Sequence, residues 1–270
     1  MTVTVEGGIT LAELQAALKQ RGQWLPIDPP HPERVTVSSL LSEDLSGPHR
    51  FGFGTIRDHL IGIQVALADG RLVRSGGRVV KNVAGFDLLK LFIGARDSLG
   101  LILEATFKLL PRPETEHFVH TRCRSLEDGA RVIQSVLESA MAPSVLDAHN
   151  LGAKPGEMSV VLGFSGGYEA VDWQLAQAGT LGFGESCTLD HERDFWDRAA
   201  LAVHRLSVLP SRVTEAIGAL GGAPFVARAG NGVIYHRGNQ PSPAFQPPMN
   251  LLRRVKDIFD PNHILPELPA

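Results

Sequence analysis

Ten histidines give the chain its largest set of potential metal ligands. None of them falls in a His-x-His or His-Glu-x-x-His arrangement, the spacings that bring two imidazoles onto one face of a strand or a helix. His117 and His120 lie in a segment with strand character, and their odd spacing directs the two side chains to opposite faces. The sequence therefore predicts no metal site.

The sequence also lacks two common nucleotide-binding motifs. Gly52-Phe53-Gly54 lacks the third glycine and the preceding strand of a dinucleotide fingerprint, so a Rossmann site is not predicted. The chain contains no phosphate loop of the Gly-x-x-x-x-Gly-Lys type. If the protein performs redox chemistry, a bound cofactor must supply it, and the sequence identifies no catalytic residue.

Small residues between positions 38 and 47 could allow a phosphate to approach the backbone. These residues are Ser38, Ser39, Ser42, Ser46 and Gly47. Serine hydroxyls can contact phosphate, although each side chain occupies space that glycine would leave free. The same pattern is also that of a serine-rich helix cap with no ligand. The residues alone leave both interpretations open.

Alternating and periodic apolar residues predict the elements that would position these segments. Asp69-Gly70 separates two apolar runs and predicts a hairpin turn. Thr10 and Glu13 form a capping box at the start of a helix that Gly22 ends. Three prolines make the loop from Trp24 to Pro30 rigid. Strands are predicted at 1–5, 61–68 and 102–109, and a short helix at 88–93.

Residues 76–111 contain Gly-Gly-x-Val-Val-Lys-Asn-Val-Ala-Gly-Phe-Asp, a following Leu-Gly-Leu-Ile and a closing Lys-Leu-Leu-Pro. These motifs resemble the later half of the flavin-binding domain of the vanillyl-alcohol oxidase/PCMH class. The run Lys81 to Asp87 is most similar to the FAD-binding subunits of glycolate oxidases. The resemblance as a whole implies that FAD is bound non-covalently. The residues implied to contact it are Pro30, Ser38, Ser39, Ser42, Ser46, Gly47, Gly54, Asp58, Gly100 and Ile102.

Two hypotheses about function follow from this resemblance. The first is an FAD-binding subunit of a 2-hydroxy acid oxidase complex, with a flavin subunit and an iron–sulfur subunit as partners. The second is a non-catalytic assembly subunit that keeps the fold but has lost FAD. Ser38-Ser39 stands where the family has paired glycines, and the family's first lobe, with its Arg-Gly-Gly-Gly loop, has no counterpart in the sequence. These departures favour the second hypothesis, and the run Lys81 to Asp87 favours the first.

The remaining chain predicts a second domain. Strands and helices alternate from His117 onward, which indicates an antiparallel sheet with helices on one face, as in ferredoxin-like folds. The expected fold class is therefore α+β, with a partial PCMH-type domain at 1–113 and an α+β domain at 114–270. The closing helix carries Lys-x-x-Phe-Asp-Pro, and the resemblance implies that this tail folds back toward the flavin domain.

Composition limits the remaining classes of protein. A net charge of −3 and the lack of a basic stripe predict no nucleic-acid binding. Two cysteines far apart in sequence favour a reducing compartment, and no apolar run is long enough to span a bilayer. We therefore expect a cytoplasmic protein whose membrane association, if any, is through partners.

Overall fold

The computed structural model describes residues 1–77, 88–198, 201–238 and 248–268, and it contains two compact units. Unit 1 comprises Met1–Gly47, Gly54–Arg112 and Phe245–Ala270, and unit 2 comprises Pro48–Phe53 and Pro113–Ala244. The expected boundary at residue 113 lies next to the unit boundary after Arg112. The expected second domain, 114–270, differs from unit 2 at its end, because Val255 and Phe259 of the last helix pack against the core of unit 1.

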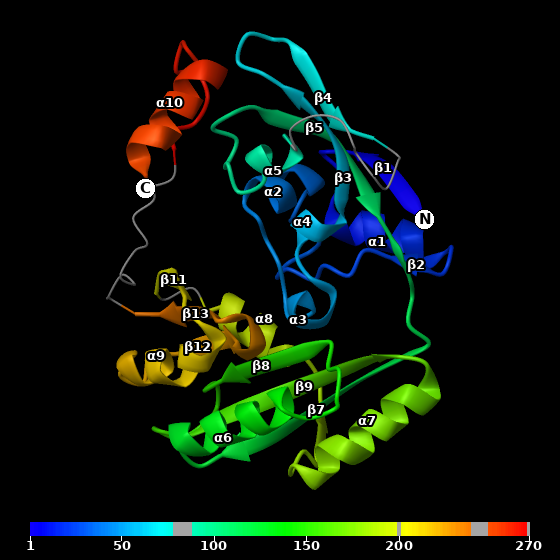
Figure 1. Cartoon of the computed structure of the whole chain (residues 1–270), viewed down its shortest axis with the longest axis vertical. Helices are drawn as coiled ribbons and strands as arrows, with labels where there is room; N and C mark the ends of the chain where they lie inside the picture. The colour runs from blue at the N-terminus through cyan, green and yellow to red at the C-terminus, as the bar shows by residue number, and fades with distance from the viewer. Residues whose placement is uncertain (78–87, 199–200, 239–247, 269–270) are drawn as a thin grey trace. The chain divides into compact units, whose positions relative to one another are not determined.

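Unit 1 is built on a four-stranded antiparallel sheet with the order β1-β5-β3-β4 (Figure 1). Its strands are β1 (Thr2–Glu6), β3 (Leu60–Ala66), β4 (Leu72–Gly76) and β5 (Leu101–Lys108), and a separate pair is formed by β2 (Gln23–Trp24) and β6 (Leu110–Pro111). Its helices are α1 (Leu11–Lys19), α2 (Val37–Ser42), α4 (Ile56–His59), α5 (Leu89–Phe92) and α10 (Met249–Phe259).

Local chemistry explains why the elements of unit 1 begin and end where they do. The hairpin between β3 and β4 turns at Gly70, whose φ of 83° suits a residue without a Cβ. The predicted capping box is confirmed, since Glu13 N donates to Thr10 Oγ1 and Thr10 N donates to Glu13 Oε2. Buried leucines of α1 and α2 pack with Val65, Ile102 and Phe107 on one face of the sheet.

Unit 2 contains a seven-stranded sheet in which every pair is antiparallel, with the order β10-β7-β9-β8-β12-β13-β11. The strands are β7 (Thr115–Cys123), β8 (Val145–His149), β9 (Met158–Gly166), β10 (Glu185–Cys187), β11 (Val203–Ser207), β12 (Phe225–Arg228) and β13 (Val233–Arg237). The helices are α3 (Arg50–Phe53), α6 (Leu126–Leu137), α7 (Tyr168–Thr180), α8 (Asp190–Trp196) and α9 (Val213–Ala219), with short 3-10 turns η1 (Pro210–Arg212) and η2 (Ala229–Asn231).

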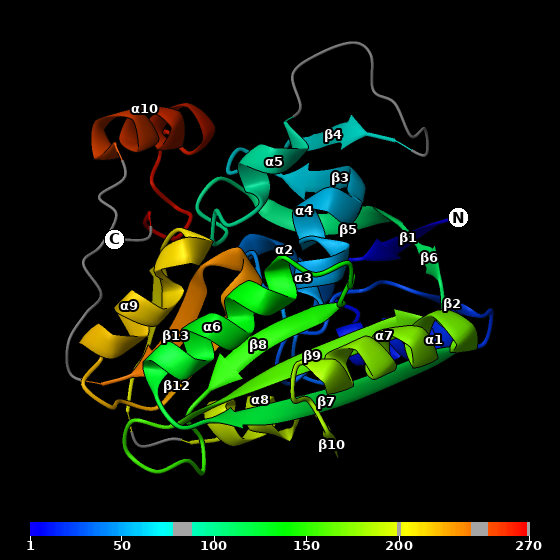
Figure 2. The ribbon, with the colours of Figure 1, turned by 60° about the horizontal axis from the view of Figure 1, so that its bottom comes forward.

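The two faces of this sheet are covered differently. Leu146 and Ala148 of β8 join a core that also holds Ile133 of α6 and Val171 of α7. Asp147, between them in the strand, points to the other face, where it meets α8. Figure 2 shows α6 and α7 along one side of the strands and α8 on the other. The expected α+β class is confirmed, but helices cover both faces.

Ser125 caps α6, because its hydroxyl accepts a hydrogen bond of 3.1 Å from Asp128 N. Replacing Ser125 with alanine leaves that N–H without its acceptor, and we expect a loss of about 1 kcal/mol in the free energy of unfolding. Urea denaturation measures this loss. Ser125→Asp keeps an acceptor at the position and should retain most of the stability, whereas equal losses in both variants would contradict the capping role.

Candidate functional site

Two of the segments expected to contact FAD meet around Gly7 in unit 1. Ser38 N, at the start of α2, donates a 2.8 Å hydrogen bond to Gly7 O. Gly7 N donates a 2.6 Å hydrogen bond to Leu103 O, and a Cβ on Gly7 would overlap the carbonyl oxygen of Ile102. The structure therefore brings Ser38 and Ile102 together through one glycine with no room for a side chain.

The other end of α2 contacts the loop that leads into β5. Arg96 N donates to Ser42 O at 2.7 Å. Asp97 follows, and burial raises the pKa of its carboxyl group while a hydrogen bond from Ser42 opposes that rise. Among the described residues Asp97 Oδ1 is buried without a hydrogen-bond partner. Gly100 closes this loop, and a Cβ there would come within 2.6 Å of Val65 Cγ1.

The remaining expected contacts have local structural roles. Ser46 and Gly47 are buried, Pro30 is half-buried, and a Cβ on Gly47 would overlap the backbone oxygen of Asp28. Gly54 has a φ of 84° and lies against Asp58. Thr55 N and Thr55 Oγ1 donate to Asp58 Oδ2 at 2.8 and 3.0 Å, which lowers the pKa of Asp58 and begins α4. The space beside Gly47 is therefore occupied by the backbone of Asp28.

Backbone N–H groups at the start of α2 are already engaged, which bears on how a pyrophosphate could bind. Val37 N donates to Ile9 O at 2.9 Å, Ser38 N to Gly7 O at 2.8 Å, and Ser39 N to Thr36 Oγ1 at 3.1 Å. An anion at a helix start needs such donors to be free. The contact implied for Ser38-Ser39 therefore does not fit backbone N–H groups. Because Ser39 Oγ already donates to Thr36 O at 3.0 Å, the hydroxyl of Ser38 is the donor that remains at this pair. The run Lys81 to Asp87 lies outside the described residues.

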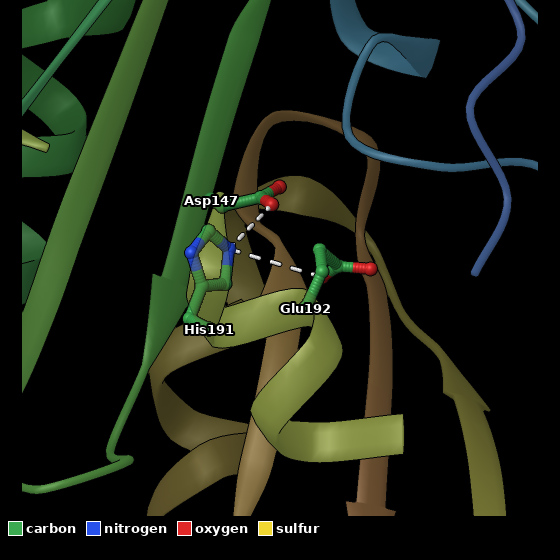
Figure 3. A group of neighbouring side chains, drawn as sticks. All are labelled: Asp147, His191 and Glu192. Carbon is green, nitrogen blue, oxygen red and sulfur yellow. Dashed lines mark hydrogen bonds and ion pairs between the residues drawn. The ribbon is translucent and has the colours of Figure 1, made fainter. Parts of the chain in front are cut away.

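Unit 2 holds a buried ionic cluster that the sequence analysis did not predict. Arg228 of β12 pairs in register with Asp147 of β8, and Arg228 Nη1 donates to Asp147 Oδ2 at 2.6 Å. Glu192 of α8 accepts from both terminal nitrogens of Arg228, at 2.6 and 2.7 Å. His191 Nε2 lies 3.2 Å from Asp147 Oδ2 and 3.8 Å from Glu192 Oε1 (Figure 3). These charges stabilise one another because burial removes their water.

Charge within the cluster fixes its protonation. Burial alone would raise the pKa of Asp147, but the charge of Arg228 and the hydrogen bond from His191 lower it overall. Burial likewise disfavours the Arg228 cation, yet the carboxylates of Asp147 and Glu192 leave its pKa raised. An ionised Asp147 can only accept hydrogen bonds, so His191 Nε2 carries the proton that it donates.

Asp147, His191 and Glu192 are close enough together to be considered as metal ligands. However, the guanidinium of Arg228 contacts an oxygen of each carboxylate, and Trp196 Nε1 donates to Glu192 Oε2 at 3.2 Å. A divalent cation would have to displace a positive group that is itself buried. The arrangement is that of an ion-pair network. Its sequence signal is a charge inside an apolar strand, as at Asp147 and Arg228.

Gly163-Phe164-Ser165-Gly166-Gly167 matches the spacing of a nucleophile elbow between β9 and α7. The geometry excludes the usual use of such a serine. Ser165 Oγ donates to Glu116 Oε1 at 2.7 Å, and His49 Nε2 lies 2.7 Å from the same oxygen. A carboxylate rather than an imidazole therefore holds the serine proton, unlike the order in a catalytic triad.

Comparison with known proteins finds relatives for part of the chain. Residues 1–76 match the FAD binding domain family. Over 114 residues the chain is 40% identical to the glycolate oxidase subunit GlcE of Escherichia coli, covering 42% of this chain and 33% of that protein. It is 31% identical over 147 residues to the subunit GlcD of Bacillus subtilis, covering 54% of this chain and 31% of that one.

A third relative is a D-lactate dehydrogenase of Archaeoglobus fulgidus, 30% identical over 142 residues that cover 52% of this chain and 31% of the relative. Each match thus spans about a third of the relative's length. Two structures of alkyldihydroxyacetonephosphate synthase share the fold over 98% of this chain and 62% and 64% of theirs, with TM-scores of 0.72 and 0.73 and identities of 19% and 18%.

Residues 1–76 therefore match an FAD binding domain, and the two solved structures show the fold that the chain shares with them. Its relatives are GlcD and GlcE subunits of glycolate oxidase and D-lactate dehydrogenases, which confirms the resemblance predicted from residues 76–111, and FAD is the cofactor that this family names. Every helix in the described part of the chain is too short or too polar to cross a bilayer.

Proposed function

We propose that the chain is the FAD-binding part of an oxidoreductase that acts on small 2-hydroxy acids within a multi-subunit complex. This proposal rests on the similarity of the chain to glycolate oxidase subunits and D-lactate dehydrogenases. Glycolate and lactate are both 2-hydroxy acids. The partners that we propose are another flavin subunit and an iron–sulfur subunit.

Within unit 1, the residues that would hold FAD are those around α2 and the start of β5. Ser38 would offer its hydroxyl, since that of Ser42 already donates to Asp97, and the backbone at Gly7, Gly100 and Ile102 would lie beside the cofactor. FAD would supply the redox chemistry itself, since no side chain of the protein can accept a hydride. The role of the protein would be to hold the cofactor and to exclude water from it.

A second proposal has a specific observation in its favour. The backbone N–H groups of Val37, Ser38 and Ser39 already donate hydrogen bonds within the protein, so they are not free to bind a pyrophosphate. On that basis the chain would be an assembly subunit that retains the fold without FAD. Titration of the purified chain with FAD separates the two proposals. Flavin absorbance that co-elutes with the protein on size exclusion supports the first, and its absence supports the second.

Gly47 offers a variant for the same experiment. Because a Cβ there would overlap the Asp28 backbone, Gly47→Ala should cost roughly 1–3 kcal/mol of stability and reduce bound flavin. Gly184→Ala is the matched control, since a Cβ at Gly184 meets no atom within 4 Å, and both properties should stay unchanged. Full flavin content in folded Gly47→Ala would remove Gly47 and its loop from the cofactor site.

A further inference from the structure

The four-stranded sheet of unit 1 has a core face and an open face. Leucines of α1 and α2 pack on the core face, against Val65, Ile102 and Phe107. Because side chains alternate along a strand, the strand register sorts the residues of the open face into three rows. In the order β4, β3, β5, β1 these rows are Gly76-Gly62-Thr106-Thr4, Arg74-Gln64-Glu104-Glu6 and, over three strands, Leu72-Ala66-Leu101. Leu72 and Leu101 are 60% and 48% exposed, so solvent reaches this face.

The middle row has an imbalance of charge. Glu104 of β5 and Glu6 of β1 are directly opposite each other, and like charges in that position repel. Within the described part of the chain, neither carboxylate forms an ion pair. Arg74, at the other end of the row, donates instead to the amide oxygen of Gln64 at 3.0 Å. The row therefore has a cation at the β4 end and two unpaired carboxylates at the β1 end.

The two outer rows have small and large side chains in the same order. Gly62 of β3 lines a hollow of about 420 Å³ together with Thr4 and Thr106, whose hydroxyls are 2.9 Å apart. At the other end of the face, Ala66 of β3 is paired with the larger and exposed Leu101 of β5. In both rows β3 thus carries the small residue and β5 the larger one.

A two-fold axis that runs parallel to the strands, between β3 and β5, makes this face complementary to itself in shape. Such an axis places β5 of one copy over β3 of the other. Leu101 then lies over Ala66 of the second copy, and the reciprocal contact repeats on the other side of the axis. In the first row Thr106 lies over Gly62, where the hollow leaves room for it. Two sheets that pack face to face in an aligned manner need such a fit.

The same axis also makes the face complementary in charge. It places β4 of one copy over β1 of the other, so that Arg74 lies over Glu6 of the second copy. Two arginine–glutamate pairs result, and they relieve the repulsion between Glu6 and Glu104. A two-fold axis at right angles to the strands would instead place Arg74 over Arg74 and Glu104 over Glu104. Charge therefore selects the axis that shape also favours.

We propose that the open face of the unit 1 sheet binds the same face of a second copy of this chain, in a symmetric dimer with two Arg74–Glu6 pairs. Four strands at spacings of about 4.8 Å, with a rise of about 3.3 Å per residue, give a face of roughly 20 Å by 20 Å. A face of this size is at the lower end of the range for specific interfaces, so the dimer is reversible, with a micromolar dissociation constant. The proposal requires neither FAD nor a substrate.

Sedimentation velocity of the full chain over a range of protein concentrations measures the dimer. We expect a monomer–dimer equilibrium that shifts toward the monomer as salt is added, because the arginine–glutamate pairs are partly exposed. A chain that stays monomeric at every concentration would overturn the proposal. Flavin content of the same samples reports on the proposed function separately.

A charge exchange tests which surface forms the dimer. Arg74→Glu and Glu6→Arg each replace two attractive pairs with two repulsive ones, and each should weaken the dimer at least tenfold. The double variant restores the pairs with their charges exchanged and should dimerise again. Arg21→Glu is the matched control, because Arg21 is exposed and follows α1 on the core side of the sheet, and its dimer should be unchanged. Dimers that persist in both single variants, or a double variant that remains monomeric, would contradict the proposed interface.

Discussion

Replacing Arg228 with methionine is expected to destabilise the protein by about 3–5 kcal/mol at neutral pH. The reason is that Asp147 and Glu192 would keep their charges while losing the guanidinium that contacts both of them. The side chains of Asp147 and Arg228 are only 1% and 2% exposed, so water cannot replace the lost contact. Urea denaturation at pH 7 measures the loss.

The pH dependence of this loss has a definite sign. In the natural protein Arg228 holds the pKa of Asp147 below its ordinary value of 3.8, so the stability from Asp147 is present above that value and is lost as pH falls through the lowered one. In Arg228→Met burial still raises the pKa of Asp147 and the hydrogen bond from His191 still lowers it, but the charge of Arg228 is gone, so the pKa rises relative to the natural protein. The penalty should therefore shrink as pH falls and Asp147 takes up a proton.

A triple replacement provides the control for Arg228→Met. Asp147→Leu, Glu192→Leu and Arg228→Met together leave no charge without a partner, and buried ion pairs can often be exchanged for apolar residues at little cost. We expect the triple variant to be more stable than Arg228→Met alone. If the single variant were the more stable of the two, the cluster would not be held together by charge pairing.

Local patterns in the sequence predicted the local structure of unit 1. The turn at Gly70 and the cap at Thr10 depend on residues within a few positions of each other, so their chemistry is visible in the sequence. The hairpin and both capping residues were therefore found where predicted. The cap at Ser125 in unit 2 is the same kind of local feature, since its partner Asp128 lies three positions away.

Long-range pairing explains what the sequence could not predict. Asp147 and Arg228 are 81 positions apart, and only the register of β8 with β12 brings them together. Strand β8 and helix α8 had not been predicted, so no side chain could be assigned to the cluster. A charged residue within an apolar run marks such a position, but its partner remains unknown until the strand order is known.

The residues expected to contact the cofactor also depend on long-range packing that the sequence does not reveal. A glycine in a sequence indicates that space is needed, without indicating what uses it. At Gly47 the space is taken by Asp28, and at Gly100 by Val65 and Ala66. Ser38 and Ile102 were both expected to contact FAD, and the structure joins their segments through Gly7, which was not among the expected residues.

Lys256 should be as sensitive to replacement as Arg228, because it anchors the end of the chain to unit 1. Its amine is buried and donates to Asp260 Oδ2 at 2.6 Å and to three backbone oxygens, those of Ser98, Leu265 and Pro266. Asp260 in turn accepts from Ile264 N and Leu265 N at 3.0 and 2.9 Å. One pair thus links α10, the residues after it and the loop before β5.

Lys256→Met is expected to release the residues after α10 from unit 1, because four acceptors lose a donor at once and Asp260 loses its counter-charge. Limited proteolysis and hydrogen exchange of residues 260–268 measure the release. Arg253→Met, an exposed change on the same helix, is the control and should leave both readouts unchanged. Equal protection of the tail in the two variants would show that Val255 and Phe259 hold it without the amine.

Acid should release the same segment in the natural protein. Burial alone would raise the pKa of Asp260, but the hydrogen bonds from Lys256, Ile264 and Leu265 lower it from 3.8 to about 2. A lowered pKa gives stability that is present above 3.8 and lost as pH falls through about 2. The tail should therefore stay protected at pH 4 and open below it. Because Ser98 lies in the loop of Asp97 and Gly100, this release should also weaken any FAD held beside α2.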